Sequence, residues 1–264
     1  MKIEVNKDAR IKEGYYLWKY FDLHKFLYFI KEKKLFFTRL DNFEDPLEGI
    51  SGETLFRMAY SPEVPEKFSP DIPEKIQNEQ KEKKIENDKL ISEGKENRQK
   101  IQFANCWFVD EKESFAMWKL YSNQDGVVIK YNKPNDFINL VKASAESYND
   151  EDFINFIYGF VEYFNKWPYE CFEGEDSEIV YSAFVKDKSF DYEKEYRFVV
   201  ATFDDCVGKY SSFELPLGDI VKDDFEIFAT PYMEDWKMKN IQKLIDIYLK
   251  GKTIRKSQLL VKKE

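Results

Sequence analysis

The order of strand-like and helix-like segments constrains the fold of this chain more than any other feature. Segments rich in aromatic and β-branched residues, which are typical of strands, lie at 15–20, 35–40, 103–109, 127–131, 179–185, 192–203, 225–230 and 254–261. Apolar residues at helical spacing predict helices that begin after Asp22 and that span 113–122, 152–164 and 235–250. Strands and helices do not alternate regularly, so the sequence predicts an α+β fold with a mostly antiparallel sheet and flanking helices.

Residues 61–100 differ from the rest of the chain. Residues 61–73 contain four prolines, and residues 74–100 are mostly Lys, Glu, Gln and Asn with few apolar positions and no sustained heptad. We expect one domain over 1–264, from which 61–100 projects as an exposed, charged, helical insertion, either a helical hairpin or a partly disordered segment. Such charge runs usually face water, which favours a solvated protrusion over an arm that binds a protein partner.

The charge balance excludes several classes of partner. With a formal net charge of -9, the chain lacks the excess of Lys and Arg that a general binder of nucleic acid or anionic membranes needs. Lys and Arg still number 41, so a local basic groove stays open. No apolar run approaches the roughly 20 residues of a membrane-spanning helix.

Cysteine usage and the first residues indicate a cellular compartment. Cys106, Cys171 and Cys206 are odd in number and widely spaced, which is typical of reduced cysteines rather than of a disulfide framework. The first residues contain no apolar segment of a secretory signal. We therefore expect a cytoplasmic protein.

Missing motifs narrow the chemistry. His24 is the one histidine, which argues against Ser-His-Asp triads and histidine zinc sites, and it reads as a residue on a helix surface. Neither a P-loop nor a GxGxxG motif is present. Any reaction must rest on carboxylates, Lys, Arg, Tyr and backbone groups, with or without Mg²⁺, and we predict no metal ligands.

Asn42–Glu48, with the sequence NFEDPLE, is the first segment that could carry chemistry. It places three carboxylates at a predicted turn that follows Arg39 on a strand. A rigid turn could present Asp45 and Glu48 into a cleft. The favoured alternative is structural: Asp45 closes an Asx-type turn, and Glu48 caps the next segment of the chain.

The helix around Met117–Tyr121 is the second candidate. Nearly every position from Phe115 to Tyr121 is apolar, so core packing explains most of the segment. Trp118 and Tyr121 lie three residues apart and could line a pocket and stack on a base or a ribose.

Tyr192–Arg197 is the third candidate. Strand alternation places Glu193, Glu195 and Arg197 on one face of the predicted strand, opposite Tyr196 and Phe198. The charges would be costly if buried. An exposed edge strand whose charges deter aggregation and a site with perturbed pKa values are equally favoured.

Four motifs, in order, resemble a family. Leu17–Tyr20 is similar to the opening L-Y/W-K-Y motif of the bacterial domain-of-unknown-function family 2971, and Asn42–Glu48 resembles its F-N-D-P-F-E turn with two replacements, Glu44 for Asn and Leu47 for Phe. Met117–Tyr121, followed by Gly126–Ile129, resembles its L/M-W-x-x-Y and G-V-x-I block. Tyr192–Arg197 matches its Y-E-x-E-Y-R signature. The resemblance spans the chain apart from 61–100, and the family has no settled activity to carry over.

An ADP-ribosyltransferase-like enzyme that uses NAD, in a toxin or phage-defence setting, is the first functional hypothesis. It rests on fold-level analogy and on the E-x-E spacing of a late strand. Glu195 would stabilise an oxocarbenium-like transition state, and Glu193 would orient the acceptor. The other candidate ligand-binding residues are Lys19 or Tyr20 with Arg39 for the phosphates or ribose, and Trp118 or Tyr121 for the nicotinamide.

Two alternatives stay open. A Mg²⁺-dependent nuclease would use Asp45, Glu48, Glu193 and Glu195 as oxygen ligands. A non-enzymatic binding or sensor module would instead bury Asp45, Glu48, Glu195 and Arg197 as a structural network, in which the arginine fixes the turn onto the sheet. A small molecule or a nucleotide is the expected ligand.

Overall fold

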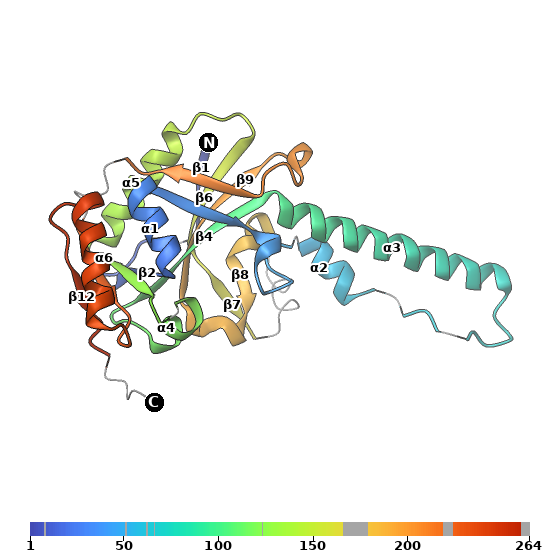
Figure 1. The fold of residues 1–264 in the computed structure, drawn as a ribbon. Coiled ribbons are helices and arrows are strands. Elements are labelled where there is room, and N and C mark those ends of the chain that lie inside the picture. The colour runs from blue at the N-terminus through green and yellow to red at the C-terminus, as the bar shows by residue number, and fades with distance from the viewer. Residues whose placement is uncertain are drawn as a thin grey trace.

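The computed structural model describes residues 1–7, 9–50, 52–61, 63–65, 67–122, 124–165, 179–218 and 224–259. Within these ranges a large mixed sheet forms the centre of the molecule (Figure 1). Cys171 lies outside the described residues, as do the last residues of the strand predicted at 254–261.

Ten strands of the described chain build the sheet. They are β1 (Lys2–Asn6), β2 (Tyr16–Phe21), β3 (Lys34–Arg39), β4 (Gln102–Asp110), β5 (Val127–Tyr131), β6 (Phe153–Phe160), β9 (Glu195–Thr202), β10 (Ser212–Pro216), β11 (Phe225–Ala229) and β12 (Ile254–Lys256). Their order is β1-β6-β9-β4-β2-β5-β11-β12, and β3 joins β4 to β10. The β1/β6 and β11/β12 pairs are parallel, and the other pairs of this sheet are antiparallel. The predicted mostly antiparallel sheet is confirmed.

Helices cover the two faces of the sheet unequally. The described α-helices are α1 (Leu23–Glu32), α2 (Gly52–Ala59), α3 (Glu74–Lys100), α4 (Phe115–Tyr121), α5 (Pro134–Ser147) and α6 (Asp235–Tyr248). Apolar side chains of α1, α5 and α6 pack together with Phe198 and its neighbours in the largest core cluster. On the opposite face, α4 contributes Met117 and Trp118 to a smaller cluster with Trp18, Tyr20 and Phe108. These helices confirm the predicted α+β class.

The first helix follows the sequence closely. Asp22 is its N-cap, and its Oδ1 atom accepts a hydrogen bond of 2.8 Å from the Lys25 backbone N–H. Lys33 ends the helix in the left-handed conformation, with φ 52°. His24 lies exposed on its surface, as predicted.

The charged insertion forms a single long helix rather than a hairpin. The 27 residues of α3 project from the body of the molecule (Figure 1). The preceding chain runs along it, because Asn87 donates a hydrogen bond to Ser61 at 3.1 Å and the Lys81 amine lies 5.5 Å from the Phe68 ring centre. At the base of α3, Gln99 donates to the Glu48 carbonyl at 2.8 Å. The predicted exposed helical insertion is confirmed. Among the residues that the structure describes, no helix has both the length and the apolarity needed to cross a bilayer.

The helix predicted at 152–164 is wrong. The segment forms β6 and the short β7 (Glu162–Phe164). Apolar residues at 154, 157, 161 and 164 match helical spacing, but β6 reads FINFIYGF and its aromatic and β-branched residues fit a strand between two neighbours. The helix of this region is α5, which the sequence reading missed.

The hairpin predicted from 179–185 and 192–203 is also wrong. Residues 179–184 form a 3₁₀ helix, η3 (Ile179–Phe184), followed by β8 (Val185–Asp187) and a second 3₁₀ helix, η4 (Lys188–Glu193). β8 pairs in parallel with β7, whereas β9 pairs with β4 and β6. The KDKSFD sequence therefore connects a strand of one sheet to a strand of the other and does not form a hairpin turn.

Gly159 allows β1 to approach β6 closely, and this contact yields a prediction. A Cβ atom at Gly159 would lie 2.7 Å from the Asn6 carbonyl oxygen. We expect Gly159→Ala to lower the free energy of unfolding by about 1–3 kcal/mol through overpacking. Chemical denaturation measures the change. Gly208→Ala is the matched control, since Gly208 also has positive φ but no atom within 4 Å of the added Cβ; an equal loss in both variants would contradict the close-contact argument.

Candidate functional site

β9 lies in the interior of the sheet and is not the exposed edge strand that one reading of the sequence favoured. β4 and β6 flank it on either side. Glu195 is 5% exposed and Arg197 is fully buried, at 0%. The two charged side chains therefore share the interior with the apolar residues that come after them on the strand.

Glu193 lies near Glu195, as predicted, but it does so from a 3₁₀ helix and not from the strand. It ends η4 and does not lie on the strand, because Lys194 adopts a left-handed conformation with φ 39° before β9 begins. Glu193 and Glu195 are nevertheless both buried, while Lys194 faces solvent. Tyr196 and Phe198 point into the core on the other face of the sheet, as strand alternation predicts.

Arg197 joins three segments of the chain. Its Nε atom donates a 2.5 Å hydrogen bond to Glu195, and its Nη1 atom donates a 2.6 Å hydrogen bond to the Ala183 carbonyl. Its Nη2 atom forms ion pairs with the carboxylates of both Glu195 and Glu48. The guanidinium carbon lies 5.8 Å from the Phe43 ring centre. One side chain thus ties β9 to the 43–48 turn and to the end of η3.

Lys186 is the second cation of this cluster, and the sequence reading missed it. Its amine lies 2.5 Å from a Glu193 oxygen, 3.9 Å from Glu195 and 4.0 Å from Glu48. The Tyr121 hydroxyl donates a short hydrogen bond to the other Glu193 oxygen. Lys186 lies in the KDKSFD sequence. Because this sequence was predicted to be a turn, Lys186 was not predicted as a site residue. We call Glu48, Lys186, Glu193, Glu195 and Arg197 the buried charge cluster.

Three carboxylates share two cations in the buried charge cluster, and this imbalance explains their pKa values. Burial disfavours the charged form of Glu195, but Arg197 and Lys186 outweigh burial and hold its pKa below the ordinary value. Burial raises the pKa of Glu193 and raises that of Glu48 to about 7. Neither Glu48 oxygen accepts a hydrogen bond of good geometry from the described residues. Glu48 is therefore the carboxyl group that takes up a proton near neutral pH.

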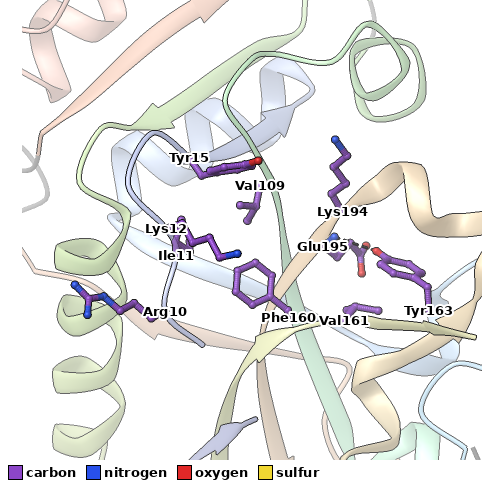
Figure 2. Close-up of a pocket in the computed structure, with 10 residues that line it drawn as sticks. All are labelled: Arg10, Ile11, Lys12, Tyr15, Val109, Phe160, Val161, Tyr163, Lys194 and Glu195. Carbon is purple, nitrogen blue, oxygen red and sulfur yellow. Dashed lines mark hydrogen bonds between the residues drawn. The ribbon is translucent and has the colours of Figure 1, made fainter. Parts of the chain in front are cut away.

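A pocket lies beside this cluster, at the ends of β4, β6 and β9. Its volume is about 490 Å³, and Glu195 belongs to its wall together with aromatic and cationic side chains. The aromatic members are Tyr15, Phe160 and Tyr163, and the cationic members are Arg10, Lys12 and Lys194. Glu195 and Tyr163 lie side by side, joined by a 2.9 Å hydrogen bond from the Glu195 N–H to the Tyr163 hydroxyl (Figure 2). None of these aromatic and cationic residues was predicted from the sequence.

The cations of the pocket differ in what they already bind. The Lys194 amine pairs with Asp110 at 2.6 Å. Lys12 has no ion-pair partner among the described residues, and its amine points toward Phe160 in the middle of the pocket (Figure 2). Lys12 is therefore the cation best placed to meet an anion.

The other predicted ligand-binding residues on β2 and α4 do not line this pocket. The Lys19 amine donates to the Cys106 carbonyl at 2.5 Å, and burial lowers its pKa to about 8. The rings of Tyr20 and Trp118 pack edge to face at 5.2 Å, and the Tyr20 hydroxyl accepts from the Ser114 N–H at 2.8 Å. Core packing, the alternative weighed for the 115–121 helix, describes Met117 and Trp118. It is wrong for Phe115 and Leu120, which are 43% and 56% exposed.

Arg39 and Asp45 have local structural partners. Arg39 binds both carboxylate oxygens of Asp41, at 2.7 and 2.8 Å. Asp45 accepts from the Leu47 N–H at 2.9 Å and so closes the Asx-type turn. Of the predicted site residues, the structure brings together Glu48, Tyr121, Glu193, Glu195 and Arg197. Lys19 and Asp45 lie close enough to interact electrostatically with Glu195 and Glu48, respectively, whereas Tyr20, Arg39 and Trp118 have other partners.

The described residues contain no group of three or more His, Cys, Asp and Glu side chains arranged to hold a metal ion. Three carboxylates, those of Glu48, Glu193 and Glu195, come together in the buried charge cluster. Each of them faces Lys186 or Arg197, which occupy the positions that a cation would need.

Comparison with known proteins finds one family model that matches part of the chain. The family model described as "Protein of unknown function (DUF2971)" matches residues 117–198. The match includes the motifs at 117–121, 126–129 and 192–197, which confirms the resemblance, whereas the motifs at 17–20 and 42–48 lie outside it. No curated protein matches the chain, and no solved structure matches it either.

Loss of Arg197 should be severe. Arg197→Met leaves Glu48 and Glu195 buried without their main counter-charge, so we expect the free energy of unfolding to fall by about 3–5 kcal/mol. Arg255→Met is the matched control, because Arg255 pairs with Glu226 at 3.1 Å on the surface and should contribute about 0–1 kcal/mol. Urea denaturation measures both, and similar small losses would contradict the bridging role of Arg197.

Glu48 should make stability depend on pH. Its pKa in the folded chain, about 7, lies above the ordinary value of 4.5, so its contribution is fully present below about pH 4.5 and is lost as pH rises through about 7. Glu48→Gln removes this titration. Between about pH 5 and pH 8 the stability of the variant should therefore rise relative to wild type. Urea denaturation at both values tests this, with Glu151→Gln on the surface as the control; a difference between wild type and Glu48→Gln that does not change with pH would contradict it.

Proposed function

We propose that this protein is a binding module for a small anionic ligand that carries a ring, a nucleotide being the class that fits. The pocket beside Glu195 carries the proposal, because it combines cationic and aromatic side chains in one concavity of about 490 Å³. Pockets of roughly 300–1,000 Å³ with a few polar groups are typical of small-molecule sites. The cytoplasmic location stays a prediction from the sequence.

Charge supports an anion as the ligand. Arg10, Lys12 and Lys194 border this pocket although the whole chain carries a net charge of -9. Of the three, Lys12 is the one whose charged end points toward Phe160 (Figure 2). Lys12 has no competing carboxylate among the described residues, so a phosphate would gain its charge without breaking an ion pair.

Aromatic surface supports a ring in the ligand. Tyr15 is 37% exposed, so part of its face is open to the pocket. Phe160 adds apolar surface, and its ring is held by an edge-to-face contact with Tyr196 at 5.1 Å. A base or a ribose can stack on such surfaces.

The buried charge cluster acts as structural support in this proposal. Arg197 is fully buried, and Glu195, Glu48 and the Ala183 carbonyl surround its guanidinium. Groups engaged in this way hold the 43–48 turn and the pocket wall in place and are not free to bind a ligand. A protein partner at 61–100 remains a prediction.

An ADP-ribosyltransferase-like reaction with NAD is the second candidate. One observation favours it: Glu195 borders the pocket, and its lowered pKa keeps it ionised at neutral pH, as the stabiliser of an oxocarbenium-like transition state must be. The toxin or phage-defence setting belongs to this candidate alone. A Mg²⁺-dependent nuclease has no comparable support, since Glu48, Glu193 and Glu195 already form ion pairs with Arg197 and Lys186.

Binding of AMP, measured by isothermal titration calorimetry, tests the proposed function. We expect measurable binding that Lys12→Ala weakens roughly tenfold, because the variant removes one charge-assisted contact to the phosphate. Lys243→Ala, on α6 and outside the pocket, should leave the affinity unchanged. Absence of AMP binding, or equal effects of both variants, would refute the proposed function.

Nicotinamide release from NAD separates the two candidates. The binding module predicts no release above the blank. The transferase predicts release by the wild type that Glu195→Gln abolishes while the variant remains folded.

A further inference from the structure

A second cavity lies next to the pocket and shares one wall residue with it. Its volume is about 370 Å³, and Arg10 lines both cavities. Ala9, the residue before Arg10, belongs to the second cavity, and Ile11, the residue after it, belongs to the first. The segment 9–12 is therefore the partition between them.

This partition is fixed to the body of the protein. The Tyr196 hydroxyl donates to the Ala9 carbonyl at 3.0 Å. Asn135 binds both backbone groups of Ile11, since it accepts from the N–H at 3.1 Å and donates to the carbonyl at 2.9 Å. Ala9 and Ile11 are buried, whereas Arg10 and Lys12 are exposed. The two cationic side chains thus extend outward from a rigid support.

The lining of the second cavity suits a ring with polar edges. Val5, which is 44% exposed, supplies apolar surface beside the buried Ile138 and Tyr158. The exposed Asn139 supplies an amide that can donate and accept hydrogen bonds. Lys7 adds a cation at this cavity, although its amine pairs with Glu162 at 2.6 Å. Each cavity therefore offers apolar surface on its own side of Arg10.

We propose that the two cavities form one bipartite site for a dinucleotide, a ligand with two rings joined by a phosphate bridge. The bridge would cross the partition at Arg10, with one ring in the pocket beside Lys12 and Tyr15 and the other in the cavity beside Asn139. This inference rests on the proposed function, because the first ring occupies the pocket assigned there. The bipartite site extends the proposed function in two ways: it includes the second cavity, and it requires a ligand large enough to fill both cavities.

The test compares three probes by isothermal titration calorimetry: diadenosine diphosphate, AMP and inorganic pyrophosphate. We expect diadenosine diphosphate to bind about tenfold or more tightly than AMP, because it fills both cavities. Pyrophosphate should bind more weakly than either nucleotide. Equal affinity of AMP and diadenosine diphosphate would overturn the bipartite site, and tight binding of pyrophosphate alone would overturn it as well.

Asn139→Glu locates the second ring. A carboxylate at this exposed position should weaken diadenosine diphosphate about tenfold and leave AMP unchanged, since AMP needs only the first pocket. Asn149→Glu adds the same charge at an exposed residue outside both cavities and should change neither affinity. Melting curves of both variants establish that each remains folded.

The outcomes separate this inference from the proposed function. If AMP binds and depends on Lys12, but Asn139→Glu leaves diadenosine diphosphate unaffected, the bipartite site is wrong and the proposed function stands. If none of the three probes binds, both are wrong.

Discussion

The guanidinium of Arg197 is the contact on which the rest of the structure depends. It is buried on one face of the interior strand β9, at 0% exposure, and it binds Glu195 on its own strand, Glu48 on a distant turn and the carbonyl of Ala183. Desolvating such a charge is costly, and only several well-placed acceptors offset that cost. The 43–48 turn, the end of η3 and β9 are consequently held in one arrangement. Lys186 extends the arrangement to Glu193 and, through Glu193, to Tyr121 on α4.

The residues of the buried charge cluster support the structure, and a ligand would bind to other residues. Its cations are occupied by three carboxylates, so an anionic ligand must find its charge elsewhere. Lys12 provides it from a segment that Tyr196 and Asn135 fix to the core. Glu195 belongs both to the structural cluster and to the ligand pocket, because it binds Arg197 and also borders the pocket. This double position explains why its replacement should affect stability whether or not it takes part in a reaction.

Local patterns in the sequence predicted the α+β class, most strands, α1 with its Asp22 cap and the convergence of Glu193, Glu195 and Arg197. The helix expected at 152–164 was wrong because β6 contributes apolar residues to core clusters on both faces of the sheet, Phe156 to one and Ile157 to the other. A strand that is buried on both faces loses its alternation of polar and apolar residues. Lys186 and the cations at 10–12 could not be found in the same way. Lys186 lies only seven residues from Glu193, but the 3₁₀ helix that brings them together was not predicted. Only tertiary packing brings Lys186 to Glu48 and Arg10 to two cavities.

The energetic coupling between Glu48 and Arg197 tests the central claim most directly. A double-mutant cycle with Glu48→Gln, Arg197→Met and the double variant, measured by urea denaturation, isolates the interaction between the two side chains. A structural bridge predicts that the two losses are strongly non-additive, with an interaction energy of about 1–3 kcal/mol. Losses that add within about 0.5 kcal/mol would contradict this claim, because they would mean that Arg197 does not hold the turn to the sheet.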